Sequence, residues 1–373
     1  MNIRRIRWAP FRIPFVSPYE TARGRATHRS GVIVVIETAS RVLGYGEASL
    51  DPSAPEDESG GLLPHVESIA RELIAANPYD VDDVLEAHVQ GNPAERAALC
   101  ALETGMADAG AREAGQPLAE LLAGDSLIRR TVPVNATIAA RATTEAAAAA
   151  LLAVAQGYGC IKLKVGMEPT LAAEAERVKT VREVIGAGVK LRLDANGAWD
   201  EPVAIATIRN LEPYDIELVE QPVPADDVIA LGKVRDTVTT SIAADEALAD
   251  YQSVAAALKH ADVLVLKPAR LGGLSIARYI AKVATAAGLG VVITTTIDTG
   301  VGTAAALHLA ASLPDEGRSH GLATASLLRD DLLTRPLAVE RGYMSLPDAP
   351  GLGVDLDEAR ATQYLGAWQE VTA

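Results

Sequence analysis

The sequence predicts an α/β fold in which a parallel barrel of alternating strands and helices follows a smaller α+β unit. Three observations predict it. From about Thr131 onward, short apolar runs of four to seven residues alternate with helical segments. The central runs recur every 22 to 26 residues, which is room for one strand, one crossover helix and two short loops. Several runs also end in a charged residue, at the strand end where parallel barrels carry their active sites.

The first hundred or so residues predict the α+β unit, because strands come first and helices follow. Strands are expected at residues 3–8, at the β-branched run 31–38 and at 43–48. A polar loop rich in proline and glycine follows at 51–61. Three helical stretches come next, at residues 62–76, 81–90 and 93–114.

The barrel is predicted to contain eight parallel strands with helices between them, such as those expected at 143–155 and 274–287. The segment beyond about residue 333 carries turn signals and is too short for a domain, so we expect it to pack back on the N-terminal unit. The expected divisions of the chain are therefore 1–128, 129–328 and 329–373. The eight predicted strands are residues 132–138, 160–165, 189–194, 216–220, 241–245, 263–267, 291–295 and 321–325.

The composition of the chain excludes some classes of binding partner. The chain of 373 residues has 49 acidic and 34 basic side chains, a formal net charge of −15. Nucleic acids and anionic membranes need clustered cations, so neither is expected as a partner. No run of 18 apolar residues and no signal peptide is recognised. The two cysteines form no CxxC pair, which is consistent with a reducing cytoplasm.

Three acidic residues stand at the ends of successive predicted strands: Asp194, Glu220 and Asp245. Strands of a parallel barrel are buried on both faces and should be apolar, so charged residues there need a reason. Three carboxylates in a mouth of low dielectric constant repel one another, and a divalent cation relieves that repulsion. Oxygen ligands completed by water suit Mg²⁺, with Mn²⁺ as the alternative. Three separate surface ion pairs are the competing interpretation, which the placement on successive strands disfavours.

Lysines flank these carboxylates in strand order. Lys162 and Lys164 are two residues apart, so they share one face of their strand, which we expect to be the inner one. Lys267 ends the strand that follows Asp245. A lysine close to a divalent cation and to another lysine should have a lowered pKa, as a general base requires. A metal with a flanking base is a device for removing the proton next to a carboxylate, although a lone lysine is more often a solvated surface residue.

The motifs that carry these residues resemble those of the enolase superfamily, in its muconate-lactonizing subgroup. The resemblance extends over nearly the whole chain. It implies a (β/α)7β TIM-like barrel and an N-terminal α+β capping domain that is completed by the C-terminal segment. The motifs are KLKVG at 162–166, LRLDANGAW at 191–199, LVEQP at 218–222, ADE at 244–246 and LKPARLGG at 266–273.

The same resemblance implies a role for each site residue. It places one Mg²⁺ at the three carboxylates and gives acid–base roles to two lysines. The third lysine is a supporting cation, and two further residues lie beside the metal ligands. The metal ligands are Asp194, Glu220 and Asp245, and the acid–base residues are Lys164 and Lys267. The supporting cation is Lys162, and the residues beside the ligands are Asn196 and Glu246.

Within the subgroup, residues 10–34, 294–314 and 320–332 look most like o-succinylbenzoate synthases, which are dehydratases of menaquinone biosynthesis. For a dipeptide epimerase we would expect an Asp-x-Asp pair on the eighth strand, to hold the substrate ammonium. This chain has GLATASLL there and no acid until Asp330. The sequence therefore argues against dipeptide epimerisation.

The segment after the seventh strand holds further candidates. Asp298 occupies a position where many relatives have Glu, and it could equally cap the helix that follows. Backbone N–H groups from Thr299, Gly300 and their neighbours could bind a substrate carboxylate. A second carboxylate could meet arginines of the cap loop, namely Arg23, Arg25 and Arg29.

Several reactions remain open for one small carboxylate substrate. In the synthase, Lys164 takes the α-proton and returns it to the departing hydroxyl, while Lys267 stabilises the intermediate by its charge. In an N-succinylamino acid racemase or a dipeptide epimerase, the two lysines serve opposite faces of the substrate. In a muconate-type cycloisomerase, Lys164 acts next to a lactone. A lyase with a Schiff-base lysine and a non-catalytic binding protein are weaker alternatives. The sequence leaves the oligomeric state open, a homo-oligomer included.

Overall fold

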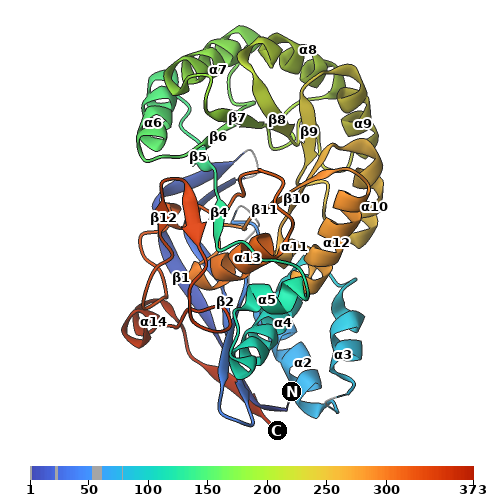
Figure 1. Ribbon diagram of the computed structural model, residues 1–373, viewed down its shortest axis with the longest axis vertical. Helices are drawn as coiled ribbons and strands as arrows, with labels where there is room; N and C mark the ends of the chain where they lie inside the picture. Colours follow the sequence, from blue (N-terminus) through green and yellow to red (C-terminus); the bar gives the residue numbers. More distant parts are fainter. Residues whose placement is uncertain (1, 22–23, 53–60, 78) are drawn as a thin grey trace.

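The computed structural model describes residues 2–21, 24–52, 61–77 and 79–373. A barrel and a cap lie against each other, and both chain ends lie at the cap (Figure 1). The cap contains a four-stranded antiparallel sheet in the order β14-β1-β2-β3. Its strands are β1 (Ile3–Thr21), β2 (Gly24–Thr38), β3 (Leu43–Ala48) and β14 (Gln369–Thr372).

The first two strands are much longer than residues 3–8 and 31–38. Strand β1 continues beyond residue 8 through Pro10 and Pro14. Pairing with β14 involves only Arg5 to Trp8, and beyond Trp8 that side of β1 forms single bridges, from Phe11 to Leu365 and from Phe15 to Leu328, in the described structure. Proline is tolerated on such an edge because no ladder hydrogen bond is lost there.

Two helices of the cap, α2 and α4, pack on its sheet. Helix α4 begins after Asn92, whose side chain accepts a hydrogen bond from Glu95 N, and it ends at Gly115 with φ 69°. A Cβ atom at Gly46 of β3 would collide with Ala101 O of α4, so glycine permits this close approach. The cap helices are α2 (Leu62–Ala75), α3 (Val81–His88), α4 (Pro93–Ala114) and α5 (Leu118–Ala123).

The barrel is built on a curled parallel sheet of seven strands in the order β11-β10-β9-β8-β7-β6-β5, with helices along its outside (Figure 1). This confirms the predicted fold class. The strands are β5 (Ala136–Ile138), β6 (Cys160–Lys164), β7 (Lys190–Asp194), β8 (Ile216–Glu220), β9 (Ser241–Ala244), β10 (Val263–Leu266) and β11 (Gly290–Ile293). The helices are α6 (Thr143–Ala155), α7 (Leu171–Ile185), α8 (Glu201–Leu211), α9 (Val228–Thr237), α10 (Tyr251–His260), α11 (Pro268–Leu271), α12 (Leu274–Ala286) and α13 (Gly300–Ser312).

The prediction of one strand at 132–138 is wrong, because two short strands form there. Strand β4 (Thr131–Pro133) pairs with the C-terminal segment, whereas β5 pairs with β6. The change of partner follows Pro133, which has no N–H to donate. Just after it, Val134 N donates to Gly342 O, and Asn135 N donates to His320 O.

The prediction of an eighth strand at 321–325 is also wrong. Single bridges from His320 to Val134 and from Gly321 to Thr294 close the barrel instead. The chain then turns into the 3-10 helix η2 (Ala325–Leu327), so no ladder can continue. A Cβ atom at Gly321 would clash with the side chain of Thr294, which shows how tightly this closure is packed.

The C-terminal segment returns to both units. Strands β12 (Val339–Glu340) and β13 (Tyr343–Ser345) form a small antiparallel sheet with β4. After α14 (Glu358–Tyr364), β14 joins the edge of the cap sheet beside β1. The segment therefore completes the cap. Within the described residues, no helix has the length and apolar character needed to cross a membrane.

Candidate active site

Three buried carboxylates meet at the carboxyl ends of neighbouring strands. Asp194 is the last residue of β7, Glu220 is the last residue of β8, and Asp245 directly follows β9. Asp194 and Glu220 are register partners in the sheet. Their exposed fractions are 1%, 3% and 2% respectively, so all three carboxylates are withdrawn from water. The three acids predicted as metal ligands thus stand at the same end of three neighbouring strands.

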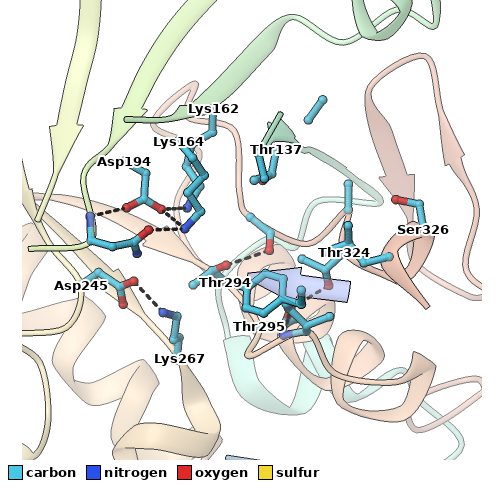
Figure 2. Close-up of a pocket in the computed structure, with 18 of the residues that line it drawn as sticks. Thr137, Lys162, Lys164, Asp194, Asp245, Lys267, Thr294, Thr295, Thr324 and Ser326 are labelled. Carbon is cyan, nitrogen blue, oxygen red and sulfur yellow. Dashed lines mark hydrogen bonds and ion pairs between the residues drawn. The ribbon is translucent and has the colours of Figure 1, made fainter. Parts of the chain in front are cut away.

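Figure 2 shows Lys162 and Lys164 pointing at Asp194, and Lys267 pointing at Asp245. Lys162 Nζ lies 3.0 Å from Asp194 Oδ2 and 3.0 Å from Glu220 Oε1. Lys164 Nζ lies 2.8 Å from Asp194 Oδ2, and Lys267 Nζ lies 2.6 Å from Asp245 Oδ2. The two lysines of β6 therefore share the inner face of their strand, as the two-residue period predicts.

Crowding of like charges is visible in the pKa values of the carboxylates. Burial, with the charges of Asp194 and Asp245, raises the pKa of Glu220 to about 8. Burial also acts to raise the pKa of Asp194, but the neighbouring Lys162 and Lys164 outweigh it and hold that pKa well below its usual range. Around Glu220, the positive charge of the lysines therefore does not fully compensate the negative charge of the carboxylates.

The lowered pKa expected for Lys164 depends on a nearby divalent cation, and the carboxylates alone act in the opposite direction. Burial acts to lower the pKa of Lys164, but the charge of Asp194 outweighs it, and the net direction is upward. The pKa of Lys162 is likewise raised, because three carboxylate charges oppose the effect of burial. Direct ion pairs with the carboxylates favour the ammonium form of both lysines.

The donor set of the site consists of carboxylate oxygens. Among the described residues, no three His, Cys, Asp or Glu side chains are already gathered as a metal cluster. The ammonium group of Lys162 bridges two of the carboxylates instead. Three buried carboxylates with only oxygen donors nevertheless match the ligand preference of Mg²⁺. The raised pKa of Glu220 shows the excess negative charge that such a cation would neutralise. The residues therefore fit a divalent cation.

Asn196 links this cluster to a fourth carboxylate. Its Oδ1 accepts a hydrogen bond of 2.7 Å from Lys164 Nζ, and its Nδ2 donates one of 2.9 Å to Glu246 Oε1. Its backbone N also donates to Asp194 Oδ1 at 3.1 Å. A positive φ of 47° at Asn196 turns the chain so that all three contacts form at once. The structure thus places Asn196 and Glu246 beside the carboxylates and Lys164.

Two residues of the site have no role in the sequence analysis, although both lie in the quoted motifs. The side-chain Oε1 of Gln221 accepts hydrogen bonds from the backbone N of Asp245 and of Ala247, at 3.1 and 3.0 Å. Arg270 Nη1 lies 3.2 Å from Asp245 Oδ1. In the sequence, Gln221 directly follows Glu220 and Arg270 lies three residues after Lys267. This proximity is the signal that could have identified them.

A cavity of about 270 Å³ opens beside the lysines. Figure 2 shows the lysines and carboxylates on one side and the hydroxyl groups of threonines and a serine on the other. The hydroxyls of Thr295 and Thr324 are 2.9 Å apart and hydrogen-bonded. Cap residues Tyr19 and Asp51 also line the cavity. Its hydroxyl-bearing wall consists of Thr137, Thr294, Thr295, Thr324 and Ser326.

The segment after β11 differs from its expected role. The cap of helix α13 is Thr299, whose side chain accepts from Val301 N, so Asp298 does not cap it. The backbone N–H groups proposed for a substrate carboxylate already have protein acceptors. Thr299 N donates to Glu47 Oε1 at 3.0 Å, and Gly300 N donates to Asp331 Oδ1 at 2.8 Å. We therefore reassign Thr299 and Gly300 to the contact between barrel and cap.

The two described arginines of the cap loop, Arg25 and Arg29, differ in their exposure. Arg29 is 2% exposed, and its Nη2 lies 3.5 Å from Asp298 Oδ1. It is therefore buried at the junction of cap and barrel rather than open to substrate. Arg25 is exposed, and Arg23 lies outside the described residues.

Glu47 leads to a prediction about pH. Burial, together with the charge of Asp298, raises the pKa of its carboxyl to about 7, despite hydrogen bonds from Thr299 and the nearby charge of Arg29. Between pH 4.5 and 7 the folded protein holds a proton that the unfolded chain has released, so stability falls as pH rises through this window. Relative to Glu47→Gln, the free energy of unfolding of the wild type should fall by roughly 2 to 3 kcal/mol between pH 5 and 8.

Urea titrations of both proteins at pH 5 and 8, at one fixed Mg²⁺ concentration, would measure that difference. Glu340→Gln changes an exposed acid and serves as the control, with the pH profile of the wild type expected. Parallel profiles for the wild type and Glu47→Gln would show that Glu47 does not carry the effect.

Two known families match the chain. One is described as "Enolase C-terminal domain-like" and matches residues 144–360. The other is described as "Mandelate racemase / muconate lactonizing enzyme, N-terminal domain" and matches residues 6–123.

Curated relatives differ in their reactions. The L-Ala-D/L-Glu epimerase of Bacillus subtilis is 30% identical over 362 residues, covering 95% of this chain and 97% of that protein. Muconate cycloisomerase 1-2 of Acinetobacter lwoffii is 31% identical, covering 92% and 90%. The o-succinylbenzoate synthase of Thermobifida fusca is 37% identical over 250 residues, covering 65% and 74%.

A solved structure gives the same overall likeness. The dipeptide epimerase of Enterococcus faecalis, complexed with Mg and the dipeptide L-Leu-L-Tyr, superposes with a TM-score of 0.87 at 30% identity. The superposition covers 95% of this chain and all of the epimerase chain. Similarity to proteins of three different activities establishes the common architecture and leaves the reaction to be argued from the site.

Proposed function

Because the chain belongs to the enolase superfamily, in its muconate-lactonizing subgroup, we propose that it is a Mg²⁺-dependent enzyme that removes the proton next to a carboxylate and eliminates water, as o-succinylbenzoate synthases do. The observation that carries the proposal is the pairing of Lys164 and Lys267 with buried carboxylates beside a cavity whose opposite wall bears hydroxyl groups. The substrate is a small carboxylate, in keeping with a cavity of about 270 Å³.

Asp194, Glu220 and Asp245 would hold the cation, for which Mn²⁺ is the alternative to Mg²⁺. When bound, it supplies positive charge that neutralises the ligands, favours the neutral form of the nearby lysines and stabilises charge that develops on a substrate carboxylate. Gln221 holds the backbone at Asp245 through its two accepted hydrogen bonds. These hydrogen bonds fix the backbone that carries the Asp245 carboxylate, independently of Asp194 and Glu220.

Lys164 is the proposed base and acid. As a neutral amine its Nζ takes the α-proton, and the same Nζ then donates that proton to the departing hydroxyl, which leaves as water. Contacts to Asp194 and Asn196 hold the nitrogen in place between the two steps. Lys267 reaches the site from the other side of the carboxylates, where its charge stabilises the intermediate. Lys162 contributes a further fixed positive charge.

The cavity wall favours this substrate class over dipeptides. Residues 321–327 contribute Gly321, Ala323, Thr324, Ser326 and Leu327 to the lining, and none carries a charge. A substrate ammonium buried against this wall would lack a carboxylate partner, which is costly in a low-dielectric site. Asp51 is an acid of the lining on the cap side of the cavity. Its Oδ2 lies 3.8 Å from Arg270 Nη2. A substrate with neutral or anionic groups at its far end matches the hydroxyl donors better.

N-succinylamino acid racemisation is the second candidate. It is favoured by the separate placement of two lysines, Lys164 on the Asp194 side and Lys267 on the Asp245 side. One lysine on each face of a substrate carbon is the arrangement that a two-base racemase needs. Such a substrate also ends in a carboxylate rather than an ammonium.

A direct assay separates the candidates. The purified protein with Mg²⁺ is given the cyclohexadiene substrate of o-succinylbenzoate synthase, N-succinyl amino acids, dipeptides and cis,cis-muconate in parallel. Aromatisation with kcat/KM at least about 10⁴ M⁻¹ s⁻¹, in the range usual for enzymes on their own substrates, is the expected result. Turnover confined to N-succinyl amino acids would establish the second candidate. Turnover of dipeptides or muconate alone would overturn both and establish epimerase or cycloisomerase activity.

A further inference from the structure

One residue of the cavity wall has an unfavourable backbone conformation. Ile297 lies between β11 and α13, lines the cavity and is 7% exposed. Its φ is 64°, in the left-handed region. A β-branched residue is rarely found there, because its side chain crowds the backbone. Such strained residues persist only when their surroundings impose the conformation, and they gather at functional sites.

The residues on both sides of Ile297 are tied to each other. Thr296 Oγ1 donates a hydrogen bond of 2.5 Å to Asp298 Oδ1, across the intervening residue. Ile297 N donates to Thr295 Oγ1 at 3.3 Å. A Thr303 hydroxyl donates to Asp298 O at 3.4 Å and ties the turn to α13. The backbone is thus held before and after Ile297.

Arg29 connects this turn to the cap. Its Nη2 lies 3.0 Å from Thr296 Oγ1 and 3.5 Å from Asp298 Oδ1, so one nitrogen reaches both flanking side chains. Its Nη1 donates to Leu50 O at 2.5 Å, one residue before Asp51 of the cavity wall. A single buried guanidinium therefore ties a cap segment and a barrel turn that line the same cavity.

We infer that Ile297 determines substrate specificity, and that Arg29, Thr296 and Asp298 are positioning residues that hold its side chain in the cavity wall. The inference rests on the proposed function, because it concerns the substrate of that site. The sec-butyl side chain of Ile297 meets an apolar part of the substrate, a ring or a methylene chain. A difference of one methylene against such a wall changes kcat/KM by about 10- to 200-fold.

The hydroxyl of Thr296 offers the mildest test. Thr296→Val keeps the shape of the side chain and removes the bridge between Arg29 and Asp298. Crystal structures of the wild type and the variant give φ at Ile297. α-Proton exchange in D₂O, with N-succinylalanine and N-succinylphenylglycine as a small and a bulky probe, gives the ratio of the two kcat/KM values.

In Thr296→Val we expect Ile297 to leave the left-handed region and the ratio to change at least about 10-fold, chiefly through KM of the bulky probe. In Ile297→Gly, where glycine adopts a positive φ freely, adding Thr296→Val should change the ratio no further. This dependence of one variant on the other distinguishes positioning from a general loss of structure. Thr207→Val, which alters a buried threonine of α8, should leave both φ at Ile297 and the ratio unchanged.

An unchanged φ at Ile297 in Thr296→Val would overturn the positioning role, whatever the activity. A preserved ratio in Ile297→Gly would overturn the specificity role. If the wild type exchanges neither probe and is inactive in the assay above, the proposed function fails. The crystal structures still decide the positioning role in that case.

Discussion

Lys164→Met should lower α-proton exchange into the substrate by about 10²- to 10⁴-fold, the usual contribution of a positioned general base. The reason is local: Nζ of Lys164 is held at 2.8 Å from Asp194 and 2.7 Å from Asn196, ready to act on the cavity side. Methionine keeps the length and apolar volume of the side chain, and Asp194 retains its contact with Lys162. Exchange in D₂O followed by NMR measures the loss.

Lys190→Met is the matched control. Lys190 begins β7 at the opposite end of the barrel, and its Nζ also pairs with a carboxylate, Glu217, at 3.0 Å. Exchange close to the wild-type rate is expected there. Equal rates in Lys164→Met and in Lys190→Met would remove Lys164 from the mechanism.

The companion variant Lys267→Met separates the two candidate reactions. With N-succinyl amino acids, a two-base racemase that lacks Lys267 should still exchange the α-proton of one enantiomer and lose the other. In the dehydratase, the same change should slow aromatisation while Lys164 continues both proton transfers. The enantiomer dependence of exchange therefore reports which of the two roles Lys267 has.

Asp245→Asn should weaken Mg²⁺ binding by at least about 100-fold and abolish turnover at ordinary Mg²⁺ concentrations. Residues that only orient metal ligands already cost 10- to 100-fold in affinity when they are changed, and a ligand should cost more. Isothermal titration calorimetry measures the affinity without any substrate. In the wild type, Mg²⁺ at 100 times its Kd should also raise the free energy of unfolding by about 2.7 kcal/mol.

Asp262→Asn is the control for the metal prediction. Asp262 precedes β10 at the other end of the barrel, where its Oδ2 accepts a hydrogen bond from Ile242 N. Asparagine retains an oxygen acceptor for that bond, so neither folding nor Mg²⁺ affinity should change. If Asp245→Asn binds Mg²⁺ as tightly as Asp262→Asn does, Asp245 is not a ligand.

The two lysine-bearing sides of the site have different supports. Lys164 contacts Asp194 and Asn196, and Asn196 in turn reaches Glu246. On the other side, Asp245 is shared between Lys267 and Arg270, at 2.6 and 3.2 Å. This asymmetry suits a reaction in which one lysine moves protons and the other supplies charge, as the dehydratase requires.

Much of the fold follows from local patterns along the chain. Strand β8 and helix α4 have the predicted bounds, because an apolar run between turn signals and a capped helix are encoded by neighbouring residues. The closure of the barrel at His320 and Gly321 is different. His320 bridges to Val134, more than a hundred residues earlier, and Gly321 bridges to Thr294 across helix α13. Such single bridges leave no periodic pattern in the sequence.

By itself, the sequence determined which residues share the end of the barrel where its strands finish. Because side chains alternate along a strand and parallel strands end on one side, Lys162, Lys164, Asp194, Glu220 and Asp245 could be placed together from spacing alone. Only the tertiary structure decided which groups stay open to a substrate. Glu47 of the cap occupies the N–H of Thr299 across 252 residues of sequence, and Arg29 reaches Asp298 across 269. Such contacts depend on how the cap packs on the barrel, which no local pattern records.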